Sequence, residues 1–138
     1  MADQVRIHSE KAPAAVGPYS QAVMCDGFLF VSGQIPLDPT TGELVQGNIE
    51  AQVRRIVQNM EFIVKEAGGE LKDIVKTKIF LMDMKNFALV NSVYAEYFGD
   101  ILPARSAIQV AGLPLGAQVE MEAIARIPDE SPGLATKL

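Results

Sequence analysis

The stretch LPARSAIQVAGLPLGAQVEMEAIA, residues 102–125, sets charged residues into a segment that is otherwise small and apolar. Residues 105–110 and 118–127, within it and just beyond it, have the composition and alternation of strands. The connection between them is short, so we predict that they form an antiparallel hairpin. Arg105 then lies opposite Glu122. A slip of one residue in the pairing of the two strands would place these side chains on different faces of the sheet.

This register gathers the charges of both strands on one face of the sheet. Arg105, Ala107, Gln109, Glu120 and Glu122 share that face, whereas the other face would pack against helices. A cross-strand pair of Arg105 with Glu122, worth roughly 0.2–1 kcal/mol, is the simplest explanation of the arginine. Alternatively, the planar guanidinium binds the carboxylate of a ligand, and a remaining glutamate orients or activates a water molecule. The residues alone leave both explanations open.

Two segments have the 3.6-residue apolar period of helices. The first covers residues 49–67, follows the favoured N-cap Asn48, and stops at Gly68–Gly69. The second covers residues 87–98 and stops at Gly99. We therefore predict two helices.

Asp26–Gly27 is a strong signal for a two-residue hairpin turn, and it predicts that the segments on either side are paired strands. With the helices, these segments predict an α+β fold: a single mixed sheet of about six strands with two helices on one face. Besides the final pair, the predicted strands lie within residues 5–7, 20–25, 28–35 and 73–82.

The other face of this sheet has no helix left to cover it. Phe28 and Phe30 alternate with Leu29 and Val31, so both sides of this strand are apolar. An apolar sheet face exposed to water is unfavourable, so we expect another copy of the same chain to pack against it.

Composition excludes several classes of function. The chain of 138 residues is predicted to be one domain, residues 1–138, with a loose tail at 129–138. Its net charge of −5 argues against binding to nucleic acid. His8 and Cys25 are the only histidine and cysteine, which excludes a Cys/His metal cluster and an internal disulfide. The sequence has no apolar run suited to a membrane span or signal peptide, so a cytoplasmic location is expected.

Four segments resemble blocks of the RidA (YjgF) family of reactive-intermediate deaminases, in the family's order and over nearly the whole chain. They are GPYSQAV (17–23), FVSGQIPLDPTTGELV (30–45), NIEAQ (48–52) and the C-terminal stretch that begins at Pro103. The resemblance implies a chorismate-mutase-like fold and a homotrimer with clefts at the subunit interfaces. It also implies hydrolysis of small anionic enamines and imines, 2-aminoacrylate and 2-iminobutyrate among them, to 2-oxo acids and ammonia. These substrates are by-products of PLP enzymes, and the family uses no cofactor or metal.

The resemblance also assigns site residues. Arg105 matches the arginine that binds the substrate carboxylate, and Glu120 matches the glutamate that orients the water or relays protons. Ala107 stands where many members have a cysteine, and there the backbone is expected to serve. The other residues expected to bind substrate are Tyr19, Ser32, Gly33 and Asn91.

Two other functions remain as alternatives. Some relatives are described as endoribonucleases or translation inhibitors, a role that the acidic charge disfavours. A non-enzymatic module that binds 2-oxo acids would use the same arginine, so the sequence does not separate it from an enzyme. A chorismate-mutase activity would rest on fold analogy alone.

Overall fold

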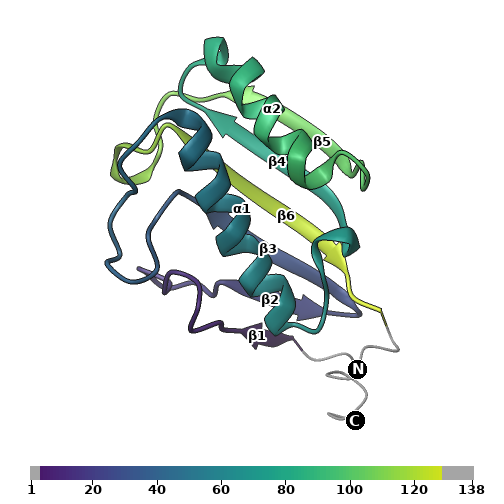
Figure 1. Ribbon diagram of the computed structural model, residues 1–138. Coiled ribbons are helices and arrows are strands. Elements are labelled where there is room, and N and C mark those ends of the chain that lie inside the picture. The colour runs from purple at the N-terminus through teal and green to yellow at the C-terminus, as the bar shows by residue number, and fades with distance from the viewer. Residues whose placement is uncertain (1–3, 129–138) are drawn as a thin grey trace.

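Two helices pack on one face of a six-stranded sheet in the computed structural model, which describes residues 4–128 (Figure 1). This arrangement confirms the predicted fold class. The predicted tail, residues 129–138, lies outside the described residues. The helices are α1 (Ile49–Glu66) and α2 (Phe87–Phe98). The strands are β1 (Val5–Ile7), β2 (Ala22–Cys25), β3 (Phe28–Gln34), β4 (Ile74–Leu81), β5 (Ala104–Gln109) and β6 (Val119–Arg126).

The last strand lies inside the sheet and not at its edge. The strand order is β1-β2-β3-β6-β4-β5, and β6 is antiparallel to both of its neighbours. The predicted hairpin of the last two strands is therefore wrong, since β5 pairs in parallel with β4. The reason is α2, which crosses over the sheet between β4 and β5 and so returns the chain in the same direction. The chain then enters the gap between β3 and β4.

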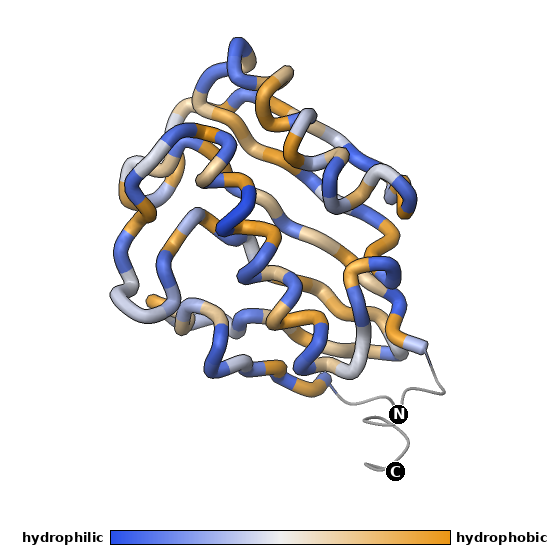
Figure 2. Tube along the Cα trace, viewed as in Figure 1, coloured by the Kyte–Doolittle hydropathy of each residue, from blue (hydrophilic) through white to orange (hydrophobic). Residues whose placement is uncertain are grey.

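Both helices begin and end close to the predicted residues. The side chain of Asn48 accepts a hydrogen bond from the backbone N–H of Ala51 at 2.9 Å and caps α1. A single 3₁₀ turn, Met84–Asn86, precedes α2, and its cap is Asp83, which accepts from the N–H of Lys85. The apolar side chains of both helices pack against the sheet in one core, and Figure 2 shows apolar residues recurring along the strands and helices.

Two irregularities in the ladders shift which residues face the core. The register of β4 shifts between Ile74 and Lys76, so Val75 is exposed although its alternation with Thr77 predicts that it is buried. A second shift lies between Val31 and Gln34 of β3. Bulges of this kind redirect side chains next to functional sites.

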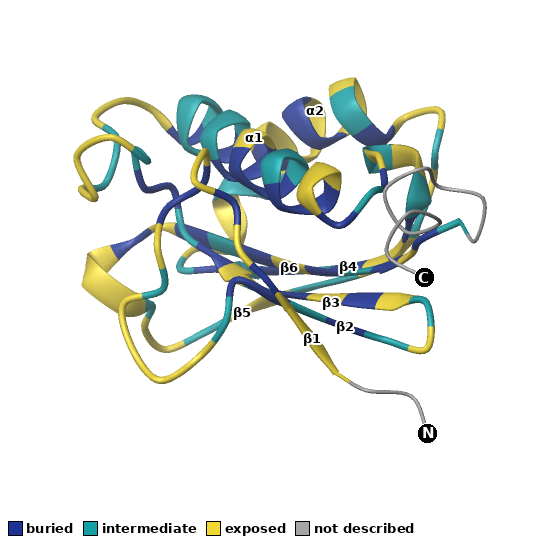
Figure 3. Cartoon of the chain, turned by 90° about the horizontal axis from the view of Figure 1, so that it is seen from below, coloured by how far each residue is buried: buried dark blue, intermediate teal, exposed yellow. Residues whose placement is uncertain are grey.

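No helix formed by residues 4–128 covers the second face of the sheet, as the sequence predicted (Figure 3). Phe28 and Phe30 on β3 and Ile108 on β5 are exposed there. Neither helix of the described chain has the length and apolarity needed to cross a bilayer.

Asn59 joins α1 to the loop after β3 through a fully buried amide. Its Nδ2 donates to the carbonyl of Leu37 at 2.8 Å, and its Oδ1 accepts from Nε of Arg55 at 3.1 Å. We predict that Asn59→Ala lowers the free energy of unfolding by about 1–3 kcal/mol, because the buried carbonyl loses its donor. Urea unfolding at fixed protein concentration measures the change. Gln58→Ala, on the exposed side of the same helix, is the control, and an equal effect of both variants would contradict this role.

Candidate functional site

Arg105 and Glu120 lie on opposite faces of the sheet. Arg105 is in register with Thr77, whose buried hydroxyl contacts α2, so the arginine faces the helices. Glu120 is in register with Phe80, whereas the next residue, Met121, faces the core. The prediction that Arg105 shares a face with Glu120 and Glu122 is therefore wrong. The pair of Arg105 with Glu122 is absent as well, because β4 separates their strands.

Arg105 is held by α2 without a counter-charge. Its Nη1 donates to Oδ1 of Asn91 at 2.6 Å. Its guanidinium lies over the ring of Tyr94, with Cζ 4.8 Å from the centroid, and 5.3 Å from that of Phe87. Each such cation–π contact stabilises the arginine by roughly 0.5–2 kcal/mol. No carboxylate in residues 4–128 pairs with Arg105, so its charge remains available to an anionic ligand.

Tyr94 is fixed from beneath by β4. Its hydroxyl and Oγ1 of Thr77 form a buried hydrogen bond of 2.7 Å. Burial raises the pKa of Tyr94, with the Thr77 bond and the Arg105 charge opposing it, so the phenol remains neutral at physiological pH. The sequence does not reveal this role, because Tyr94 follows the helical period of the apolar residues of α2 and resembles an ordinary core residue.

A cavity of about 420 Å³ lies beside Arg105. Leu102 and Pro103 form its rim where the chain enters β5. Asn91, one of the predicted site residues, lines the same cavity. The structure thus brings Asn91 and Arg105 together.

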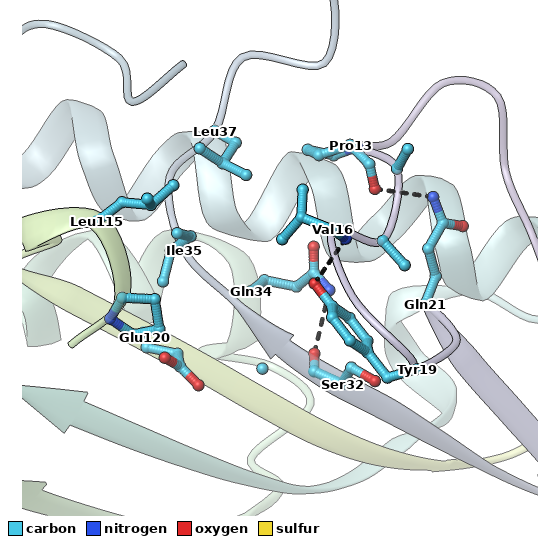
Figure 4. Close-up of a pocket in the computed structure, with 14 residues that line it drawn as sticks. Pro13, Val16, Tyr19, Gln21, Ser32, Gln34, Ile35, Leu37, Leu115 and Glu120 are labelled. Carbon is cyan, nitrogen blue, oxygen red and sulfur yellow. Dashed lines mark hydrogen bonds between the residues drawn. The ribbon is translucent and has the colours of Figure 1, made fainter. Parts of the chain in front are cut away.

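The remaining predicted residues, except Ala107, gather around Glu120. Tyr19, Ser32, Gly33 and Glu120 line a second cavity, of about 480 Å³, shown in Figure 4. The loops before β2, after β3 and before β6 complete it. The loops contribute Pro13, Ala14, Ala15, Val16, Gln21, Ile35, Leu37, Pro114 and Leu115, and Gln34 lines the cavity from the end of β3.

The side chain of Glu120 occupies the space next to Gly33. A Cβ atom added at Gly33 would overlap Oε2 of Glu120, whose carboxylate rests directly on this backbone. The contact falls where the β3 register shifts. Burial raises the pKa of Glu120, and the negative charge of Glu122 raises it further. A carboxylate with a raised pKa is a stronger base than an exposed one.

Two hydroxyls and one amide hold the loop on the far side of this cavity. Ser32 Oγ donates to the carbonyl of Ser20 at 2.6 Å, and the Tyr19 hydroxyl accepts from the N–H of Val16 at 3.3 Å. The buried amide of Gln21 donates to the carbonyl of Pro13 at 2.9 Å. Gln21 follows Tyr19 closely in GPYSQAV, but nothing in the sequence pattern marks it as a buried anchor.

Ala107 lies on the same face of the sheet as Arg105, and not on the face that carries Glu120. It is in register with Ile79, and its side chain packs against the core beneath the helices. The strand that carries it is the edge of the sheet, so no neighbouring strand of the described chain covers its outer backbone groups. Within residues 4–128, no group of three or more His, Cys, Asp or Glu side chains is placed to hold a metal ion.

Residues 9–127 match the protein-family model described as Endoribonuclease L-PSP. The chain therefore belongs to this family, which is the RidA (YjgF) family that the sequence resembles.

Individual relatives are similar over most of their length. A RutC family protein of Pyrococcus abyssi is 51% identical over 91% of this chain and 98% of its own. A mouse protein named 2-iminobutanoate/2-iminopropanoate deaminase is 49% identical over 86% of this chain and 88% of its own. Among solved structures, E. coli TdcF with bound serine superposes with a TM-score of 0.85 at 39% identity, over 90% of this chain and 99% of its own.

The raised pKa of Glu120 is directly testable. We predict that Glu122→Gln lowers the pKa of Glu120, because it removes the nearby negative charge. The pKa stays above the ordinary value of 4.5, because burial, the larger cause, is unchanged. A ¹³C NMR titration of the side-chain carboxyl measures both. Glu43→Gln is the control, and an unchanged Glu120 titration in the Glu122 variant would contradict the electrostatic coupling.

Proposed function

We propose that this protein hydrolyses 2-imino acids and their enamine tautomers, 2-aminoacrylate and 2-iminobutyrate among them, to 2-oxo acids and ammonia. The observation that carries the proposal is the environment of Arg105, a guanidinium that Asn91 and two aromatic rings hold and that no carboxylate of the described residues neutralises. Such a group binds a small carboxylic acid bidentately. The name of the mouse relative supports the same reaction, and serine bound to E. coli TdcF is a small acid of this kind.

The complete site is proposed to form between subunits. The face with Arg105 and the face with Glu120 point in opposite directions, so a single chain cannot bring the two side chains onto one small substrate. Two copies can, if the Arg105 cavity of one meets the Glu120 cavity of the next. A repeated contact of this type closes into a ring. We propose the homotrimer that the family resemblance implies, with the uncovered sheet face buried inside it.

The proposed roles follow from these positions. Arg105 binds the substrate carboxylate, and Glu120 orients a water molecule beside the C=N carbon, which removes much of the entropy cost of their encounter. An enamine first tautomerises to the imine: its β-carbon takes up a proton and its nitrogen loses one. Tyr19, Ser32 and Gly33 shape the Glu120 side of the site. Asn91 orients Arg105, and the backbone at Ala107, on the outer edge of β5, offers further hydrogen bonds.

The reaction then proceeds without oxidation or reduction. The water oxygen bonds to the imine carbon, the C=N electron pair moves to nitrogen, which takes up a proton from solvent, and Glu120 accepts the proton that the water loses. Glu120 returns this proton to the amino nitrogen. The C–N bond breaks, ammonia leaves, and the hydroxyl group loses its proton to give the 2-oxo acid.

The structure gives little support to ribonuclease activity. The described residues that line the Glu120 cavity include no lysine or arginine to neutralise a phosphate backbone. A non-enzymatic module would bind 2-oxo acids in the same site but would not hydrolyse imines. The assay described next measures this hydrolysis and so separates the two functions.

We predict that Arg105→Ala lowers kcat/KM for 2-iminobutyrate by roughly 100-fold or more, because a charge-assisted bidentate contact is lost. Threonine dehydratase generates the substrate in situ, and release of 2-oxobutyrate and ammonia is followed. Arg54→Ala is the matched control, since Arg54 is an exposed arginine that already pairs with Glu96 at 2.7 Å. Full activity of the Arg105 variant would exclude the proposed role of the carboxylate.

A mixing experiment tests the shared site. Arg105→Ala and Glu120→Gln are each expected to be inactive. When the two variants are unfolded together and refolded in equal amounts, about a quarter of wild-type activity should return, because each mixed trimer keeps one intact site. If both residues acted from the same subunit, the mixture would stay inactive. Light scattering confirms that trimers have formed, and native mass spectrometry, which resolves the mass difference between the two variants, confirms that they are mixed.

A further inference from the structure

A threonine and a tyrosine form a polar pair inside the apolar core, next to Arg105. Thr77 is the one polar residue among the four buried residues of β4. Tyr94 lies on α2, and its side chain is only 7% exposed. The hydrogen bond of 2.7 Å between their hydroxyls joins the helix to the sheet at this point. Both hydroxyls give up their contact with water, and this cost needs an explanation.

The stability of the fold does not explain the pair. A hydrogen bond between two neutral buried groups contributes little net free energy, because both groups bond to water in the unfolded chain. A valine and a phenylalanine have nearly the same shapes and would fill this space with no polar group to satisfy. The other buried residues of α2 are Val90, Val93 and Phe98, so an apolar pair would match its surroundings.

The position of the pair relates it to Arg105. Thr77 and Arg105 are register partners on the parallel strands β4 and β5, and both contact α2. The ring of Tyr94 spans the two residues, because its hydroxyl bonds to Thr77 and its centroid lies 4.8 Å from Cζ of Arg105. Phe98 packs against the same ring, with the two centroids 4.6 Å apart. The surface on which the guanidinium rests is therefore fixed by the core.

The other two partners of Arg105 do not supply the same constraint. Phe87 lies farther away, with its centroid 5.3 Å from Cζ, and its ring has no polar atom that a hydrogen bond could hold. Asn91 is exposed, and its Oδ1 accepts from Nη1 alone. One such bond holds one nitrogen of the guanidinium but does not define the plane of the group. Among the three, Tyr94 combines contact with the guanidinium and a hydrogen bond into the core.

We infer that Tyr94 is a positioning residue for Arg105, and that the buried hydroxyl of Thr77 acts through it to hold the guanidinium in the plane that receives the substrate carboxylate. This inference rests on the proposed function, in which Arg105 binds that carboxylate. A guanidinium presents its paired N–H groups only in its own plane, so its rotation removes the bidentate contact although the charge stays nearby. The ring of Tyr94, over which the guanidinium lies, limits this rotation.

Removal of the hydrogen bond tests the inference. Thr77→Val keeps the β-branched shape and Tyr94→Phe keeps the ring, but each leaves the other hydroxyl buried without a partner. We expect KM for 2-iminobutyrate to rise about tenfold in both variants and kcat to change by no more than about twofold, because the carboxylate contact is made in the ground state and the transition state alike. Thr77→Ser keeps the hydroxyl and should restore the wild-type KM. Tyr97→Phe removes a hydroxyl from the same helix outside the Arg105 cavity, and as the control it should leave KM unchanged.

The double variant Thr77→Val/Tyr94→Phe separates positioning from stability. With both hydroxyls removed, neither is left unsatisfied, so the urea midpoint should return toward that of the wild type. The ring still lacks its hydrogen bond, so KM should remain raised about tenfold. A KM that recovered together with the urea midpoint would overturn the inference, because the pair would then only support the fold.

NMR of ¹⁵N-labelled arginine gives a readout that does not need turnover. The guanidinium signals of Arg105 are assigned by their loss in Arg105→Ala, and exchange between its two Nη groups reports rotation of the guanidinium. We expect this exchange to be severalfold faster in Thr77→Val and Tyr94→Phe than in the wild type, and unchanged in Tyr97→Phe.

The outcomes distinguish the two proposals. If the wild-type protein does not hydrolyse 2-iminobutyrate, the proposed function fails, and the exchange rates still show whether Tyr94 holds Arg105. If the imine is hydrolysed but neither KM nor the exchange rate changes in the two single variants, the deaminase stands and the positioning role is overturned.

Discussion

The pairing of β4 with β6 on one side and β5 on the other is the constraint on which the candidate site depends. Side chains alternate along each strand, so the register of Thr77 with Arg105 and of Phe80 with Glu120 directs the two functional groups to opposite faces. One face meets α2, which holds the arginine, and the other is open. The sheet thus keeps Arg105 and Glu120 of one chain apart. This is why assembly and chemistry are linked in the proposed function.

The sequence predicted the local structure well and the long-range pairing poorly. The Asp26–Gly27 turn, with φ values of 53° and 80°, and the Asn48 cap are set by their own residues, so both were predictable. Periodicity of two shows which residues share a face of a strand, but it does not show which strand lies alongside. The connection AGLPLG before β6 is short enough for a hairpin, yet the crossover through α2 had already placed β5 beside β4. That choice depends on contacts distant in sequence.

The family resemblance pointed to the residues of the candidate site, but not to the buried polar residues that hold them in place. Gln21, Asn59 and the Thr77–Tyr94 pair are polar groups inside the core, each with its hydrogen bonds made. No described side chain of the core leaves a buried polar atom without a partner. Such groups look like ordinary core or loop residues in a sequence, because their function depends on a partner far along the chain. They hold the loops and rings that shape both cavities in one geometry.

The close approach of Glu120 to the backbone at Gly33 has a consequence for how this chain can change over time. A carboxylate that occupies the volume of a missing Cβ ties two positions together, although they lie on different strands. While the glutamate remains in this position, a side chain at position 33 would require its carboxylate to move. A descendant that gives up the glutamate is released from that restriction. In a relative with a bulky residue at position 33, the side chain at position 120 is therefore expected to be shifted or replaced.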